Sequence, residues 1–397
     1  MMRSRLPLED EAKVVSLCQA LIRLPSVSGQ EAAVIEYAGK YLRQQQFDEV
    51  FTDQYGSLVG IINGSRPGPT ILFDGHADTV PVEPGTWKRD PYGGEIEGRR
   101  LYGRGASDMK GAIAAFLTAV TAYAEACRGN FPGRLAVALT AYEELFEGVA
   151  ARRVSEMVRP DFVVIGEATN LALNCGQRGR AEVVLEARGR SAHSANPEKG
   201  VNAVLLMLKA LTGLSELPPA DDSELGKGIA VVTDIISAPY PGASVVPAFC
   251  RATLDRRLVR GESPESVLTA IRHVLERLEA DVQVSLARDE RTCYTGEKIA
   301  AEKFFPAWYF SPSEPFIRSI VDAFEREQTE LRRGIYGFCT NGSHYAGERQ
   351  IRTVGYGPSH EYLAHIADEY IEVDDMCAAV EGYRRIIGTW HDNWETY

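Results

Sequence analysis

The feature that most constrains the fold is a series of short apolar strands that alternate with helical segments in the first half of the chain. TILFDG (70–75) is apolar on both faces, as a strand is when both sides of its sheet are covered. RLAVALTAY (134–142) and DFVVIGE (161–167) are also strand-like, and the Ala-rich segment 109–127 has helical character. This alternation predicts an α/β domain with a largely parallel sheet flanked by helices.

A second pattern begins near residue 177. There the order strand–helix–strand–strand–helix–strand predicts a separate α+β module of ferredoxin-like type over 177–290. A chain of 397 residues exceeds what one hydrophobic core usually sustains, so two domains are expected on length alone. We therefore predict one α/β domain formed by 1–176 and 291–397, with a loop-rich stretch after Arg288 and an inserted domain between the two parts.

Composition narrows the classes of partner and the compartment. The net charge of −12 argues against nucleic acid or an anionic membrane surface as a partner, since both attract a basic face. The seven cysteines are scattered, odd in number and without a CxxC pair, which favours reduced thiols in the cytoplasm. The N-terminus has no apolar segment behind its arginines, and no apolar run approaches the roughly 18 residues of a membrane span. We expect a soluble, cytoplasmic protein.

Acidic and imidazole side chains follow the strands of the first half. These residues are His76, Asp78, Asp108, Glu143, Glu144 and Glu167. Taken singly, each has an ordinary explanation, such as a helix cap or a solvated surface charge. Parallel strands, however, bring their carboxyl ends to one edge of the sheet. Carboxylates that converge there without Lys or Arg repel one another, and a divalent cation resolves that repulsion.

Spacing suggests different tasks within this group. His76 and Asp78 lie two residues apart, so in an extended strand they share a side, and a metal-ligating histidine usually donates its other ring N–H to a carboxylate. Asp74 lies at the same spacing on the other side of His76, and strand geometry leaves both acids open. Glu143 and Glu144 diverge, so one can bind a metal while the other acts as a base toward water.

Six segments in order resemble the M20 metallopeptidase family. They are HADTVP, YGRGASDMKG, the EE pair, IGEATN, GRSAHSANPEKGVNA and the region of the late His365. The family includes carboxypeptidase G2-like enzymes, acetylornithine deacetylases and succinyl-diaminopimelate desuccinylases. The segments GQRGRAEV, DRRLVRGE and CTNGS look most like a branch of hydrolases linked to selenium metabolism.

The resemblance implies a zinc-peptidase-like domain that holds two zinc ions per chain, although Mn²⁺ or Co²⁺ also suit carboxylate-rich ligation. Its metal ligands would be His76 and Glu167 for one ion, Glu144 and His365 for the other, and Asp108 as the bridge. It also implies that Asp78, rather than Asp74, orients His76, and that Glu143 is the general base. The inserted domain would be a lid and dimerisation domain.

The resemblance extends to the last ligand and to the substrate side. The family has a glutamate four residues after the ligand; Glu369 has this spacing from His365, whereas His360, the second candidate, has no such match. His193 would stabilise the oxyanion, from its own or a neighbouring subunit. The candidate substrate contacts are Arg257, which would clamp a carboxylate, Asn202, Asn341 and Gly342, with His344 as a further one.

One departure from the family pattern concerns the loop around the EE pair. The family usually has an acidic residue before this pair and a glycine soon after, whereas this chain has Tyr142 before it and LFEG after it. Both catalytic carboxylates are kept, so the departure affects the shape of the pocket.

These features together predict a metal-dependent hydrolase that cleaves an amide bond of a small N-acyl amino acid, as a deacetylase or desuccinylase does, and that forms a homodimer. A dipeptidase or carboxypeptidase of the same family is the alternative, because both reactions release an amine and a carboxylate. A catalytically silent metal-binding assembly protein is the alternative from another class. The presence of Glu143 argues against it, since a silent homologue need not retain the base.

Overall fold

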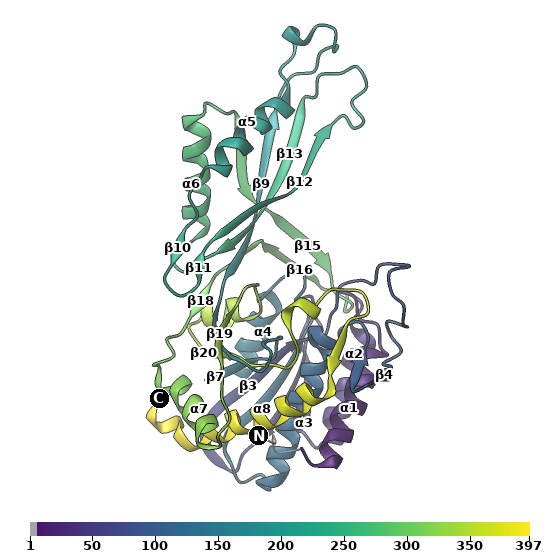
Figure 1. Ribbon diagram of the computed structural model, residues 1–397, viewed down its shortest axis with the longest axis vertical. Coiled ribbons are helices and arrows are strands. Elements are labelled where there is room, and N and C mark those ends of the chain that lie inside the picture. The colour runs from purple at the N-terminus through teal and green to yellow at the C-terminus, as the bar shows by residue number, and fades with distance from the viewer. Residues whose placement is uncertain (1–5) are drawn as a thin grey trace.

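The computed structural model describes residues 6–397, so the first five residues of the N-terminal segment lie outside it. It shows a large α/β domain and a smaller lid that rises from it (Figure 1). The chain enters the lid after β8 (Leu173–Gln177) and pairs with the lid sheet for the last time at β17 (Phe304–Phe305).

The large domain is built on a mixed sheet of nine strands with a parallel centre. In spatial order the strands are β1 (Glu49–Thr52), β2 (Leu58–Asn63), β6 (Pro132–Thr140), β3 (Arg66–His76), β7 (Phe162–Ile165), β20 (Arg352–Gly355), β8 and β18 (Trp308–Tyr309), with β19 (Arg333–Tyr336) also on β8. The four central strands β6, β3, β7 and β20 run parallel, while β1, β2 and β18 pair antiparallel with their neighbours. The predicted largely parallel sheet is confirmed in this mixed form.

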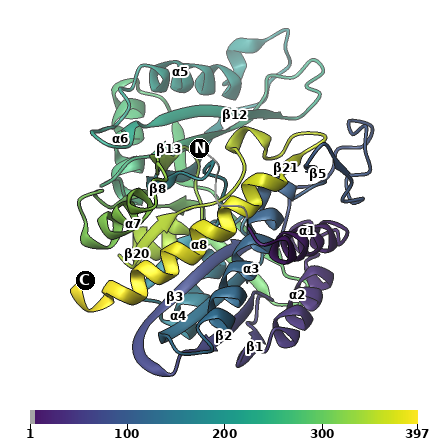
Figure 2. The ribbon, with the colours of Figure 1, turned by 60° about the horizontal axis from the view of Figure 1, so that its bottom comes forward.

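Both faces of the sheet are covered, which explains why its central strands are apolar on both sides. Ile71 and Phe73 of β3 join a core beneath one set of helices, whereas Leu72 points into a second core on the other face. The first face carries α1 (Leu8–Ile22), α2 (Ala32–Gln44), α3 (Gly111–Ala126), α7 (Pro315–Arg326) and α8 (Val373–Asn393). The other face carries α4 (Val149–Val158) and the short helix η3 (Ser343–Glu348). Figure 2 shows α8 crossing the first face beside α3.

The lid is an antiparallel sheet with two helices on one face. Its elements in chain order are β9 (Gly179–Arg188), α5 (Ala203–Ser215), β12 (Ile229–Ala238), β13 (Phe249–Leu258), α6 (Pro264–Arg277) and β14 (Val282–Leu286). The spatial order is β12-β13-β9-β14, and a separate apolar core joins β9 and β13 to α5 and α6. This order, together with the strand–helix–strand–strand–helix–strand sequence, is the ferredoxin-like arrangement that the pattern predicted.

The return from the lid differs from the expected loop-rich stretch. It contains the hairpin β15 (Arg288–Thr292) and β16 (Lys298–Glu302), which lies between the two domains (Figure 1). The hairpin was missed because its strands are rich in exposed charged residues and show no apolar alternation.

Shorter elements complete the part of the chain that the structure describes. They are β4 (Ile96–Glu97), β5 (Arg100–Tyr102), η1 (Ala106–Lys110), η2 (Pro197–Lys199), β10 (Asp221–Asp222), β11 (Gly226–Lys227), η4 (Glu361–Leu363), β21 (Tyr370–Glu372) and η5 (Trp394–Thr396). Within residues 6–397, the helices are all too short or too polar to cross a membrane.

Candidate metal centre

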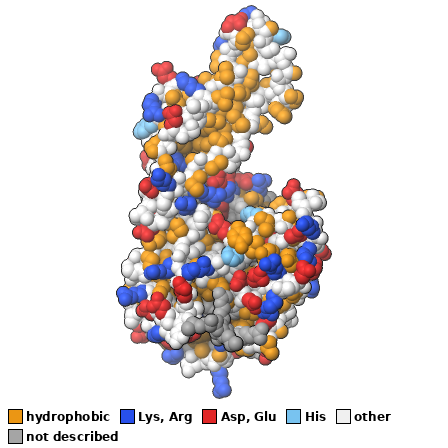
Figure 3. Space-filling view, viewed as in Figure 1, with side chains coloured by type: hydrophobic (Ala, Val, Ile, Leu, Met, Phe, Trp, Pro, Cys, Tyr) orange, Lys and Arg blue, Asp and Glu red, His pale blue; other side chains and the backbone are white. Residues whose placement is uncertain are grey.

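The carboxyl ends of the central strands bring five of the predicted residues into one cluster. His76 ends β3, Glu144 follows β6, Glu167 follows β7, Asp108 lies in η1, and His365 lies in the loop before β21. The cluster lies beneath the lid, and Figure 3 shows acidic, basic and histidine side chains gathered where the two domains meet.

Asp108 lies at the middle of this cluster. Its Oδ1 is 2.9 Å from Nε2 of His76, whose Nε2 is also 3.2 Å from Oε1 of Glu167. Its Oδ2 is 3.0 Å from Nε2 of His365, which lies 3.0 Å from Oε2 of Glu144. The two oxygens of one carboxylate therefore face two separate groups, each made of a histidine and a glutamate. His360 is outside this arrangement, because its ring stacks on Tyr362.

The charges of the cluster are those of a cation site. Burial raises the pKa of Glu144 to about 7 and the pKa of Glu143 well above its usual range. Hydrogen bonds to Asp108 and Glu144 raise the pKa of His365 to about 10. For His76, burial opposes the charge, but its hydrogen bonds to Asp108 and Glu167 outweigh burial and hold its pKa well above 6.5. Protons on the histidines thus offset the repulsion between the acids, a task that a divalent cation performs while leaving the histidines neutral.

The donor atoms also fit a metal. Ligand atoms of His76, Asp108 and Glu144 lie within 4.8 Å of one another, as do those of His76, Glu143 and Glu167. Oε1 of Glu143 and Oε1 of Glu144 are buried without a hydrogen-bond partner among the described residues. Buried carboxylate oxygens without partners are costly unless a ligand satisfies them, so the residues present fit a divalent cation.

The aspartate after His76 has a different contact from the expected one. Nδ1 of His76 donates to the backbone carbonyl of Asp78 at 2.8 Å, while the carboxylate of Asp78 is 3.8 Å away. That carboxylate accepts from the hydroxyl of Ser28 at 2.7 Å and from the backbone N–H groups of Glu143 at 3.0 Å and Glu144 at 3.2 Å. Asp78 therefore orients the ring through its main chain, and its side chain fixes the backbone of the EE pair.

Glu369 fixes the other loop of the cluster. Its carboxylate accepts from the backbone N–H groups of Gly105, Ser107 and Asp108, and from Nη1 of Arg104 at 2.6 Å. In the sequence, the spacing of Glu369 served only to choose His365 over His360 as the last ligand. The structure shows that it also holds the turn that carries Asp108, a role that becomes visible only once the two loops are side by side.

The cluster lines a cavity of about 290 Å³, and two arginines of the lid, Arg180 and Arg257, line it as well. Arg180 of β9 pairs with Glu147 at 2.6 Å and also with Glu182 and Asp255. Arg257 of β13 pairs with Asp255 at 3.0 Å, and its side chain is 30% exposed. Arg180 was not among the predicted site residues, although it lies opposite Arg257 in the strand register and shares its side of the sheet.

Asn341 and Gly342, two of the proposed substrate contacts, lie outside this cavity. The amide of Asn341 donates to Asp74 and to Thr140, and its oxygen accepts from the backbone N–H of Gly148. Gly342 packs so closely against Trp308 and Gln177 that a Cβ would lie 2.6 Å from the indole nitrogen. Their polar groups are used in packing the CTNGS turn under the site, and their contact with substrate stays a prediction.

His344 and Asp74 also have structural partners. The ring of His344 lies 2.7 Å from Oε2 of Glu348, in the same helix η3, and 2.7 Å from Oγ of Ser155 in α4. The contact with Ser155 joins η3 to α4. His344 is therefore not among the residues that line the cavity, although the sequence suggested it as a further substrate contact. Asp74 accepts from Asn341 at 2.8 Å and from the hydroxyl of Tyr345 at 2.9 Å. Its carboxylate thus serves the core beneath the site, which leaves the orientation of His76 to Asp78.

The remaining two candidates lie in the lid. His193 is in the loop between β9 and α5, opposite Val245, and its ring accepts from the backbone N–H of Ala195. Asn202 caps α5, because its side chain accepts from the N–H groups of Val204 and Leu205. Neither residue lines the cavity of its own chain.

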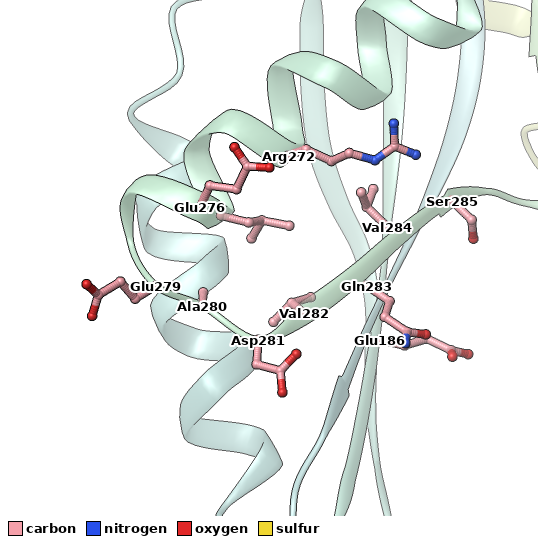
Figure 4. Close-up of a pocket in the computed structure, with 11 residues that line it drawn as sticks. Glu186, Arg272, Glu276, Glu279, Ala280, Asp281, Val282, Gln283, Val284 and Ser285 are labelled. Carbon is pink, nitrogen blue, oxygen red and sulfur yellow. The ribbon is translucent and has the colours of Figure 1, made fainter.

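A larger hollow, of about 680 Å³, lies on the outer side of the lid between α6 and β14 (Figure 4). Its polar lining is mostly acidic, from Glu186, Glu276, Glu279 and Asp281, with Arg272 beside them. None of the residues that line it is a histidine or a cysteine, so the chemistry that the sequence predicted belongs to the smaller cavity.

Comparison with known proteins agrees with this geometry. The model of peptidase family M20/M25/M40 matches residues 72–389. The uncharacterized protein YgeY of Escherichia coli is 30% identical over 395 residues, which cover 96% of this chain and 95% of that protein. A succinyl-diaminopimelate desuccinylase of Methylocella silvestris is 30% identical over 404 residues, which cover 95% and 97%.

Solved structures show the same fold. The M20 family metallo-carboxypeptidase Sso-CP2 of Sulfolobus solfataricus superposes with a TM-score of 0.76 at 17% identity, covering 96% of this chain and 99% of that one. Because the family model spans most of the chain and both relatives cover nearly all of it, the chain belongs to peptidase family M20/M25/M40 and is a hydrolase.

Proposed function

We propose that the chain hydrolyses the amide bond of a small N-acyl amino acid at a dinuclear metal centre. The observation that carries this proposal is the position of Asp108, whose two oxygens face two histidine–glutamate groups in a cavity that also contains Glu143. The desuccinylase relatives support the class of bond. A dipeptidase or carboxypeptidase is the second candidate, and the fold shared with Sso-CP2 supports it.

The metal would be held by nitrogen and carboxylate oxygen alone. His76 and Glu167 would bind one ion, His365 and Glu144 the other, and Asp108 both, with Zn²⁺ as the proposed metal and Mn²⁺ or Co²⁺ as alternatives. The hydrogen bond from Nδ1 of His76 to the carbonyl of Asp78 leaves Nε2 available as the ligand. When bound, such an ion polarises the scissile carbonyl and lowers the pKa of water toward about 7.

Glu143 would serve as general base and then as general acid. Its side chain lines the cavity, its Oε1 has no partner among the described residues, and burial raises its pKa, so it accepts a proton readily. The carboxylate of Asp78 holds its backbone N–H, which fixes where its side chain begins. Glu143 would take the proton of the attacking water and deliver it to the leaving amine.

Arg257 would bind the carboxylate of the substrate. It reaches the cavity from the lid with a partly exposed guanidinium, whereas Arg180 is held by three acids. A planar guanidinium binds a carboxylate through two parallel hydrogen bonds, so Arg257 would set the orientation of the substrate relative to Glu143.

A second copy of the chain would complete the site. The edge strand β12 and the neighbouring helix α5 expose a row of large apolar side chains, namely Val231, Val232, Ile235, Ile236, Leu205 and Leu208. Figure 3 shows hydrophobic side chains gathered over the lid. An unpaired apolar edge invites pairing with another strand, whereas the opposite edge, β14, exposes Gln283 and Ser285. Two-fold pairing through β12 would place the loops that carry His193 and Asn202 near the partner's cavity.

We also assign the enzyme to a reducing compartment, the cytoplasm. All seven cysteines are free and six of them are buried, so none is positioned as a disulfide.

The substrate class is tested with a panel of N-acetyl, N-succinyl and N-carbamoyl amino acids and dipeptides, assayed with zinc, manganese or cobalt. We expect turnover of an N-acyl amino acid and its complete loss on chelation, with recovery when metal is returned. Hydrolysis that persists in the chelated protein would refute the metal mechanism. Cleavage of dipeptides alone would assign the chain to the peptidase alternative, and no turnover at all would favour the silent homologue.

Replacing Glu143 separates catalysis from metal binding. We expect Glu143→Ala to lower kcat by about 10²–10⁴-fold, the usual contribution of a general base. Elemental analysis should still find two metal ions per chain, because the other five residues of the cluster remain. Full activity in this variant would show that another group acts as the base.

Asp78 and Asp74 form a matched pair for testing the support of the metal ligands. Asp78→Asn removes an acceptor from the backbone N–H groups of Glu143 and Glu144, so we expect metal affinity to fall roughly 10–100-fold. Asp74→Asn, an equally buried change that serves the core, should leave metal affinity unchanged. Competition with a fluorescent chelator measures both constants, and equal losses would contradict the division of roles.

Mixing two inactive variants tests whether His193 acts across a dimer. A heterodimer of His193→Ala and Glu143→Ala chains has one site with an intact Glu143 facing an intact His193 of the partner subunit. Random mixing should therefore restore about a quarter of wild-type activity. If His193 served its own chain, no activity would return, and a monomer in light scattering would rule out the dimer itself.

A further inference from the structure

We propose that Lys303 is a positioning residue that links the lid to the loop carrying the base, so that the orientation of the lid sets the position of Glu143. Lys303 lies between β16 and β17, outside the cavity lining, and its side chain is buried. The proposal rests on the proposed function in one respect, the role of Glu143 as base.

The main chain of Lys303 belongs to the lid. Its N–H donates to the carbonyl of Ala287 at 2.8 Å, and its carbonyl accepts from the N–H of Glu182 in β9 at 3.0 Å. The next two residues form β17 and pair with β9. Both the N–H and the carbonyl of Lys303 are therefore bonded to the lid, so its backbone moves when the lid moves.

The side chain of Lys303 contacts the loop that carries Glu143, residues 141–148. Its Nζ donates to the backbone carbonyl of Leu145 and lies 4.0 Å from the centre of the Phe146 ring. Leu145 follows Glu144 directly and lies two residues after Glu143. One buried residue thus spans from the lid sheet to the segment that carries both glutamates, with a charge-assisted hydrogen bond at its end.

Two further contacts tie the same loop to the lid side. On one side of the EE pair, the hydroxyl of Tyr142 donates to the carbonyl of Thr292 in the hairpin at 3.0 Å. On the other side, Glu147 pairs with Arg180 of β9 at 2.6 Å. Tyr142 has a φ of +60°, a conformation that a bulky residue adopts only when its surroundings impose it.

The loop is thus held from two directions. The carboxylate of Asp78 fixes its backbone from the catalytic domain, while Lys303, Thr292 and Arg180 fix it from the lid side. A lid that swung away would break the hydrogen bond between Nζ of Lys303 and the Leu145 carbonyl, and a bond from a charged donor contributes more than a neutral one. The arrangement in which Lys303 is seated is therefore the one that defines the position of Glu143, and lid closure assembles the base as well as covering it.

The test uses Lys303→Met, which keeps the length and the apolar contact with Phe146 but removes the donor. We expect kcat on the cleaved substrate to fall roughly 10- to 100-fold, as small displacements of a catalytic group do. KM and metal content should stay within about twofold of wild type. Hydrogen exchange followed by mass spectrometry should show faster exchange in the peptide 141–148 and unchanged exchange in β9. Lys303→Arg should retain most of kcat, and Lys298→Met, on the exposed side of the same hairpin, should match wild type.

Wild-type kcat in Lys303→Met overturns the proposal, as does a rise in KM, a loss of metal or exchange that is unchanged in 141–148. The exchange measurement needs no substrate, so it decides the coupling even if the wild-type protein cleaves nothing on the panel and the proposed function fails. Tyr142→Phe, which removes only the hydroxyl bonded to Thr292, provides the same two readouts if Lys303→Met does not fold. For Tyr142→Phe we expect faster exchange in 141–148 and a smaller fall in kcat. Wild-type exchange together with wild-type kcat in that variant would overturn the proposal.

Discussion

The mutual repulsion of buried carboxylates is the constraint on which the rest of the site depends. Asp108, Glu143, Glu144 and Glu167 line one cavity, and none of them has a lysine or arginine as an ion-pair partner within the described residues. Their charges are balanced by His76 and His365, which sit on the two oxygens of Asp108. Such an arrangement is stable only with protons or a cation in the middle, and only if the backbones that present the acids cannot move apart.

Two further acids supply that rigidity, and neither faces the cavity. Glu369 gathers three backbone N–H groups of the η1 turn and the guanidinium of Arg104. Asp78 gathers two backbone N–H groups of the EE pair and the hydroxyl of Ser28. Each carboxylate satisfies donors that would otherwise be buried without partners, so each holds a loop as a helix cap holds the first turn of a helix. The acids that line the cavity and the acids that hold the loops are thus different residues. The two supporting acids each follow a histidine of the cluster: Asp78 lies two residues after His76, and Glu369 lies four residues after His365.

These differences show what the sequence could and could not predict. Strand periodicity located the parallel centre of the sheet, because both faces of β3 are buried and its apolar residues record that burial directly. The five residues that the family motifs named as metal ligands lie in one cluster, which includes His365 and not His360. Asp78 does contact the ring of His76, but through its backbone carbonyl rather than its carboxylate. A two-residue spacing does not distinguish these two oxygens. Arg180 was missed, and the packing role of Asn341 was not foreseen, because their partners, Glu147 and Asp74, are distant in sequence and belong to other elements.

The residues of the EE loop that depart from the family pattern contact the hairpin β15–β16, Lys303 and Arg180. Where the family usually has an acidic residue before the EE pair, Tyr142 reaches out to Thr292, and the LFEG that follows offers Leu145 and Phe146 to Lys303 and Glu147 to Arg180. Each of these contacts joins the loop to the lid or to the chain returning from it. The large domain holds the amides of Glu143 and Glu144 through Asp78 and that of Tyr142 through Glu31, whereas the Leu145 carbonyl and the Glu147 carboxylate have their partners in Lys303 and Arg180. The loop that carries Glu143 is therefore in contact with both domains, which is the geometry that the proposed positioning role of Lys303 requires.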